Sequence, residues 1–278
     1  MSRNNSGRLG VKDINTDTPV VTNSSFDFAT PTEFVDLPTK GRYYPEGHPL
    51  QNAEHVEIRY MTAKDEDILT SKTLLQKGIA IERFLQSVIV DKRVKVGDLY
   101  IGDKNAILIA ARITGYGEDY DINISCPSCG VSGKSTFDLQ SLQPYYGDNL
   151  DENMQITDDN NFLVALPVSK ANLEVRLMTS KDEDYLISLA ETKRKKRLPE
   201  TNLTDQLARM IVSVNGDSSP STVSKFIGAM PARDSRYLRQ NYFKIVPDIN
   251  MTHEFTCKSC YQTQELGVPL TAEFFWPK

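Results

Sequence analysis

Four cysteines, arranged as two Cys-x-x-Cys pairs, are the residues of this sequence with the clearest chemical potential. Cys126 and Cys129 flank a Pro-Ser spacer, and Cys257 and Cys260 flank a Lys-Ser spacer. Thiolate sulfur is a ligand that zinc favours, and four thiolates complete a tetrahedral coordination shell with no open position. We therefore expect these four residues to bind one structural zinc ion per chain, as a closed site rather than a catalytic one.

Paired cysteines are also compatible with disulfides or with a redox couple. The polar start of the chain lacks the apolar core of a secretion signal, which disfavours a disulfide framework. A thioredoxin-type motif opens a helix in a βαβ unit. Here residues 120–124 alternate between apolar and polar before the first pair, and a polar turn and another short apolar stretch follow it. Strand, knuckle and strand are typical of half a zinc ribbon.

The two cysteine pairs are separated by 127 residues, far more than the roughly 15–20 residues of a compact zinc module. An internal repeat explains this gap. The sequence VEIRYMTAKDEDIL begins at residue 56, and LEVRLMTSKDEDYL begins at residue 173, with nine of fourteen positions identical. The sequence therefore predicts a duplicated unit in which each copy ends in one knuckle, so that neither copy alone completes the zinc site.

This repeat defines the expected fold class and domains. We expect an α+β protein in which a strand–helices–zinc-knuckle unit occurs twice and a shared four-cysteine, zinc-ribbon-like site joins the copies. The first copy would span residues 51–150 and the second residues 151–278. Residues 1–30 are polar and predict a flexible arm, and residues 31–50 predict an ordered extended segment laid on the domain.

Local patterns within each copy predict the elements that would carry the knuckles. The Glu-x-Arg segment suits a short strand, and Thr62 and Thr179 fit helix N-caps because Thr-x-x-Asp is a capping-box variant. The acidic triplets 65–67 and 182–184 would then lie in a first helical turn, where successive carboxylates point in different directions and cannot converge on one metal. Apolar stripes predict further helices around residues 79–88, 103–115, 203–211 and 231–242.

Composition excludes several classes of function. The net charge of −5 argues against coating nucleic acid through bulk charge, and three histidines leave little room for histidine-based catalysis. No stretch approaches the ~18 apolar residues that a membrane span needs. Phosphate-binding loops, nucleophile elbows and HExxH metal motifs do not occur. The sequence contains no catalytic constellation and predicts no enzyme.

Two remaining segments allow more than one interpretation. The basic run 193–197 could contact phosphates or an acidic partner, but it also fits the C-terminal end of a solvated helix. Residues 274–276, Phe-Phe-Trp, could dock a partner, but we expect them to cover the zinc hairpin.

The order of several motifs resembles a known family, the hub assembly proteins of T-even-type, contractile-tailed phage baseplates (hub subunit or hub assembly chaperone). The residues that carry the resemblance are LPTKGRYY at 37–44, IRYMT at 58–62, DEDIL at 65–69, GDK at 102–104, RITGYG at 112–117 and CPSCG at 126–130.

This resemblance implies a non-enzymatic protein that contacts hub or other tail proteins, as a chaperone or a minor structural part. It would act in the host cytoplasm during assembly and could remain in the virion baseplate. The alternative is a zinc-ribbon protein that binds nucleic acid or serves transcription, which the acidic net charge disfavours. A zinc or thiol enzyme would require an open ligand position or a reactive cysteine.

Overall fold

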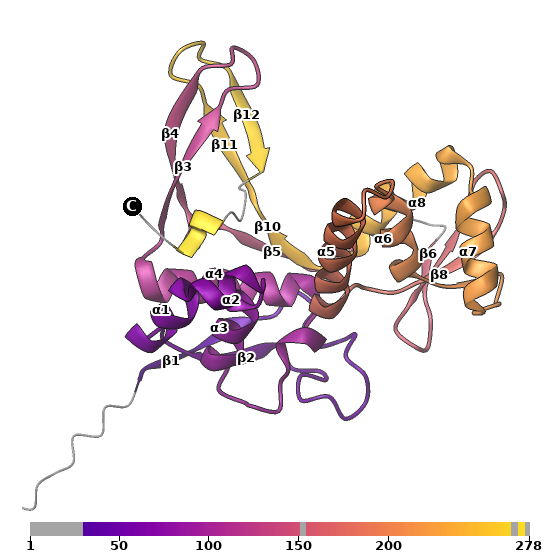
Figure 1. The fold of residues 1–278 in the computed structure, drawn as a ribbon, viewed down its shortest axis with the longest axis horizontal. Coiled ribbons are helices and arrows are strands. Elements are labelled where there is room, and N and C mark those ends of the chain that lie inside the picture. Colours follow the sequence, from indigo (N-terminus) through magenta and orange to yellow (C-terminus); the bar gives the residue numbers. More distant parts are fainter. Residues whose placement is uncertain (1–29, 151–153, 268–271, 276–278) are drawn as a thin grey trace, which may run out of the picture. The chain divides into compact units, whose positions relative to one another are not determined.

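The computed structural model describes residues 30–150, 154–267 and 272–275. It is a mixed α+β structure in which runs of helices and runs of antiparallel strands follow one another along the chain (Figure 1). Residues 1–29 of the predicted arm and Trp276 of the predicted cover lie outside the described residues.

The first half of the chain forms a two-stranded sheet, a group of helices and a long hairpin. Its elements are β1 (Thr32–Asp36), β2 (His55–Arg59), α1 (Ala63–Thr70), α2 (Lys72–Gln76), α3 (Ala80–Val88), η1 (Val96–Asp98), α4 (Ile101–Tyr116), β3 (Asp119–Ser125), β4 (Ser132–Asp138), η2 (Leu139–Ser141) and β5 (Gln143–Tyr145). β1 pairs with β2, and β3 pairs with β4, both antiparallel.

The second half forms a four-stranded antiparallel sheet, four helices and a second hairpin. Its elements are β6 (Met154–Ile156), β7 (Phe162–Ala165), β8 (Asn172–Val175), α5 (Ser180–Lys195), α6 (Asn202–Met210), β9 (Ile211–Val214), α7 (Pro220–Ala229), α8 (Ala232–Ile245), β10 (Asp248–Asn250), β11 (Thr252–Thr256), β12 (Thr263–Gly267) and η3 (Ala272–Phe275). The sheet order is β6-β7-β8-β9, and β11 pairs with β12.

The helices predicted from apolar stripes are confirmed as α3, α4, α6 and α8. The bounds differ by a few residues. Ile79 and Pro231 are the N-caps of α3 and α8, and Ile211 begins β9 instead of ending α6, because β9 adds a strand beside β8 in the sheet. Within the part of the chain that the structure describes, no helix is both long enough and apolar enough to pass through a membrane.

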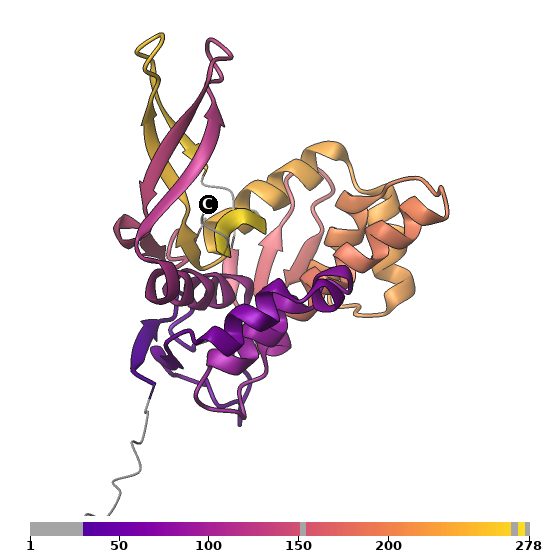
Figure 2. The same ribbon diagram turned by 60° about the vertical axis from the view of Figure 1, so that its left-hand side comes forward.

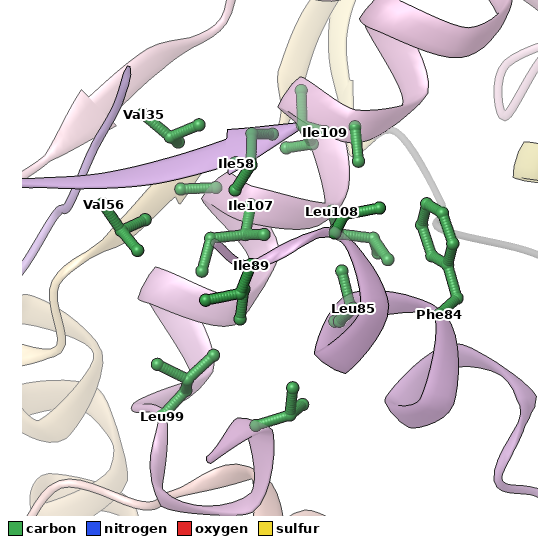
Figure 3. Packing of buried hydrophobic residues seen from close by; sticks show 14 of the residues in the cluster. Val35, Val56, Ile58, Phe84, Leu85, Ile89, Leu99, Ile107, Leu108 and Ile109 are labelled. Carbon is green, nitrogen blue, oxygen red and sulfur yellow. The ribbon is translucent and has the colours of Figure 1, made fainter. Parts of the chain in front are cut away.

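Two clusters of buried apolar side chains stabilise the described structure. The first gathers side chains of β1, β2, α3 and α4, including Ile58, Phe84 and Ile107, all fully buried (Figure 3). The second gathers side chains of β7, β8, α6 and α8. Tyr43, from the predicted extended segment, packs in the second cluster, whereas Tyr44 packs in the first.

The repeated sequence builds the same local structure twice. At the end of β2, the Arg59 guanidinium donates two hydrogen bonds to Asp65, of 2.7 and 2.8 Å. After β8, Arg176 donates two bonds of the same lengths to Asp182. Both aspartates also complete capping boxes, which confirms Thr62 and Thr179 as the N-caps of α1 and α5. The acidic triplets therefore begin helices, as expected.

A second feature recurs around a Leu-Pro turn. In the turn after Leu37, the Thr39 N–H donates to the Asp103 carboxylate in α4. The turn after Leu166 donates the N–H groups of Val168 and Ser169 to the Asp234 carboxylate in α8. Asp103 and Asp234 are both fully buried, so each turn is attached to the helix that precedes a knuckle hairpin.

Main-chain hydrogen bonds and one short strand pair join the two halves. The Ser180 N–H at the start of α5 donates to the Leu99 carbonyl at 2.8 Å, and Lys104 of α4 forms an ion pair with Glu183 of α5. β5 pairs antiparallel with β10. A Cβ at Gly102 of α4 would lie 2.1 Å from the Pro247 carbonyl oxygen, so only glycine lets the chain leading into β10 come this close.

The buried Arg112 of α4 holds the root of the first hairpin. Its guanidinium donates to the carbonyls of Gly117 and Asp119, where α4 turns into β3, and to the carbonyl of Phe274. The Phe274 ring packs against Tyr120 of β3. Phe275 packs against Phe84. Phe274 therefore packs against the root of the first zinc hairpin, as expected, and both rings also complete the first core beside α3 and β3.

The repeated arginine–aspartate pair predicts a pH-dependent stability. Burial alone would raise the pKa of Asp65, but hydrogen bonds from Arg59, Ser87 and Thr62 hold it well below its usual range. A carboxyl with a lowered pKa in the folded state stabilises the protein above its unfolded pKa of about 4, and loses that effect as the pH falls.

We therefore expect Asp65→Asn to lower the free energy of unfolding by about 3 kcal/mol at pH 7, and by progressively less below about pH 4. Chemical denaturation across this pH range measures the difference. Asp67→Asn, which changes an exposed carboxylate in the same turn, is the control and should change stability by less than about 0.5 kcal/mol. Equal effects of the two substitutions would contradict the assigned role of the pair.

Candidate metal centre

The first knuckle is the tight turn that connects β3 to β4. The ladder ends at the pair Ser125 and Ser132. Beyond it, the Cys126 N–H donates to the Val131 carbonyl at 2.9 Å, and the Gly130 N–H donates back to the Cys126 carbonyl at 2.8 Å. These bonds fold the intervening residues so that Cys126 and Cys129 face the same side.

The second knuckle repeats this turn between β11 and β12. The Cys257 N–H donates to the Gln262 carbonyl at 3.0 Å, and the Tyr261 N–H donates to the Cys257 carbonyl at 2.9 Å. The two hairpins lie side by side in both views, with their tips at the same end (Figures 1 and 2). The strand–knuckle–strand prediction is therefore confirmed in both places.

The structure brings all four predicted cysteines together. Their sulfur atoms lie within 4.8 Å of one another. The Cys126 and Cys260 sulfurs are 3.7 Å apart, as are those of Cys129 and Cys257. A zinc ion with four sulfurs at about 2.3 Å has sulfur–sulfur edges of about 3.8 Å, whereas a disulfide bond requires about 2.05 Å. The donor set and its spacing fit a tetrahedral metal site and not a disulfide.

In both knuckles, the first cysteine is more deeply buried than the second. Cys126 and Cys257, the first cysteine of each pair, are almost fully buried, whereas Cys129 is exposed and Cys260 is partly so. The Ser259 N–H donates to the Cys257 sulfur, and the Gln264 amide lies 3.9 Å from the Cys126 sulfur. Such weak donors around a thiolate cluster orient the sulfurs and spread their negative charge.

The pKa values of the thiols and the repulsion between thiolates favour a bound cation in this cluster. The amides of Cys260 and Ser259 lower the pKa of Cys257 to about 6. For Cys129, the Val131 amide favours the thiolate, yet desolvation and the neighbouring thiols raise its pKa to about 12. Four thiolates this close repel one another, so without a cation some sulfurs keep their protons. A divalent metal ion removes this repulsion and displaces those protons.

The other charged motifs of the sequence do not join this cluster. Among the residues that the structure describes, the four cysteines form the one group of three or more potential metal-ligating side chains. The basic run 193–197 lies at the C-terminal end of α5, as the solvated-helix interpretation expects, and its first member, Lys193, pairs with Asp205 of α6.

Sequence reasoning missed the side chains that place the hairpin roots. In the sequence, Arg112 stands out only as part of a family motif. Its three partners are main-chain carbonyls, and no sequence pattern indicates that an arginine binds them. The sequence patterns also do not single out the position after each second cysteine. Gly130 and Tyr261 occupy this position, and both have a left-handed backbone. An alignment of the two knuckle sequences places these two residues at the same position.

The fold and the site together define a mixed α+β protein with a four-cysteine cluster suited to zinc. The profile of the family described as "T4 bacteriophage base plate protein" matches residues 32–276. The chain therefore belongs to this family of phage baseplate proteins. Comparisons with curated proteins and with solved structures found no match.

The geometry predicts that Cys126→Ser abolishes stoichiometric zinc binding, because it removes one of the four sulfurs of the cluster. Wild-type protein should hold one zinc ion per chain by elemental analysis and, with Co²⁺, show the absorption of a tetrahedral thiolate site. A chelator should lower its melting temperature markedly but leave that of the variant almost unchanged.

Ser128→Ala is the matched control, since Ser128 is exposed between the two cysteines of the same knuckle. It should keep the zinc content and the chelator response of the wild type. An undiminished zinc content in Cys126→Ser would refute the four-sulfur site.

Proposed function

We propose that this chain is a non-enzymatic component of phage baseplate hub assembly that acts through contacts with hub or other tail proteins, as a chaperone or a minor structural part. The observation that carries the proposal is the family match over residues 32–276. The closed four-sulfur cluster supports a structural role, because a metal ion bound by four thiolates has no open position for a substrate.

We also propose that Cys126, Cys129, Cys257 and Cys260 bind one structural zinc ion, which joins two copies of a duplicated unit. The matching Arg–Asp pairs, Leu-Pro turns and knuckle hydrogen bonds support the duplication. Each hairpin supplies only two sulfurs, so the ion would keep both hairpins in a fixed relation. The two copies would then present their surfaces to partners in one geometry.

The site of action would be the host cytoplasm during assembly, with the virion baseplate as the final location of a structural part. The alternative of a nucleic-acid-binding zinc ribbon gains little support. Lys193 of the basic run is engaged with Asp205, and the chain is acidic overall. Binding to DNA or RNA that falls steeply with added salt would favour the alternative.

The proposal is tested in cells infected by phage that lacks the gene for this chain. Wild-type protein supplied from a plasmid should restore baseplate assembly, seen by electron microscopy and sedimentation of tail intermediates. The double variant Cys126→Ser/Cys257→Ser should restore far less, because both knuckles lose their buried sulfur. Ser128→Ala serves as the control and should restore assembly fully.

Mass spectrometry of purified particles then separates the two roles. Presence of the chain in finished baseplates supports a structural part, and its presence only on assembly intermediates supports a chaperone. Normal baseplates in the complete absence of the chain, or its recovery only with nucleic acid, would overturn the proposed function.

A further inference from the structure

The residue that follows the second cysteine has a left-handed backbone in both knuckles. Gly130 has φ = 74° and Tyr261 has φ = 57°. Each donates its N–H to the carbonyl of the first cysteine, so the turn requires this conformation in both places. For a residue with a Cβ the left-handed region costs about 1–2 kcal/mol. Glycine avoids that cost in the first knuckle, and tyrosine incurs it in the second.

Tyr261 gains nothing from local packing in return for this cost. The residue is 81% exposed, the largest exposed fraction among the large hydrophobic residues that the structure leaves uncovered. A Cβ at the equivalent Gly130 would meet no atom within 4 Å, so side chains at this position project from the knuckle. A strained backbone that holds an unpacked aromatic ring is typical of a residue used for contact with another molecule.

The surroundings of Tyr261 show what kind of molecule fits. Val131, from the other knuckle, is 50% exposed. The equivalent ranges 126–134 and 257–265 contain two lysines, Lys134 and Lys258, and one carboxylate, Glu265. Zinc with four thiolates carries a formal charge of −2, so with these three side chains the tips would carry a net charge of about −1. The tips therefore combine exposed apolar groups with little net charge.

This charge disfavours nucleic acid as the ligand. Binding to phosphates requires an excess of positive charge, and single-strand binding requires several aromatic side chains in succession. The tips offer neither. An apolar pocket on a protein, in contrast, suits a tyrosine, because a large ring with few rotatable bonds contributes much contact area at little entropic cost.

We propose that the paired knuckle tips, with Tyr261 as the main anchor and Val131 as a second exposed apolar residue, insert into an apolar pocket on another protein of the phage baseplate. This inference rests on the proposed function and names its contact surface. Turns bound to a metal ion would be rigid, so the Tyr261 ring would already have its bound orientation when the partner binds it.

The inference makes an unusual prediction for Tyr261→Gly. Because glycine relieves the left-handed backbone, this variant should keep one zinc per chain and a melting temperature equal to or above that of the wild type. Its yield of assembled baseplates in the complementation assay should nevertheless fall about 10- to 100-fold, the loss expected when a central aromatic anchor is removed.

Two control variants separate the ring from its position. Tyr261→Phe keeps the ring and should assemble baseplates nearly as well as the wild type. The swap Gly130→Tyr/Tyr261→Gly places a ring at the same turn position of the other knuckle, and it should fail to restore assembly. Wild-type yields from Tyr261→Gly would overturn the proposal.

A photo-crosslinking amino acid at position 261 identifies the partner in infected cells. An adduct to a baseplate protein, mapped to a peptide of apolar side chains, supports the proposal. An adduct to a second copy of this chain, to nucleic acid, or to no protein at all would overturn it.

The two proposals fail in distinguishable ways. If the cysteine double variant blocks assembly and Tyr261→Gly does not, the tip contact is wrong and the baseplate role stands. If neither variant affects assembly and phage without the chain builds normal baseplates, the baseplate role itself is wrong.

Discussion

The convergence of four thiol groups is the constraint on which the rest of this structure depends. Sulfurs from two hairpins lie within 4.8 Å of one another, close enough that four negative charges repel strongly unless a cation lies between them. Each hairpin delivers only two of the four. The roots of both hairpins must therefore be held in a fixed relation, although more than a hundred residues of chain separate the cysteine pairs.

The elements below the hairpins provide that relation. The β5–β10 pair joins the two roots directly, and Gly102 allows the chain to pass close to α4. Arg112 fixes the turn from α4 into β3 by donating to main-chain carbonyls, and among the described residues no carboxylate forms an ion pair with it. Such a guanidinium is satisfied by carbonyl dipoles and needs no ion pair.

The two halves share the same local structures around the repeated sequence, but they differ in helix length and at the tips of their hairpins. The Arg–Asp pair and the capping box are the same in both, whereas α1 has eight residues and α5 has sixteen. The knuckles differ at the position held by Gly130 in one and Tyr261 in the other. For a family of baseplate proteins, such differences on a shared framework suit contacts that are specific to one face of the molecule.

The sequence by itself determined the local features: both knuckles, both capping boxes, most helices and the identity of the four clustered cysteines. These follow from short-range rules, because spacing, caps and apolar periodicity act within a few residues. Only the tertiary structure decided that Phe274 and Phe275 complete the first core and that Arg112 binds three carbonyls. It also decided that the sulfurs meet at tetrahedral spacing. These contacts join residues far apart in the chain, where packing rather than local preference selects the partner.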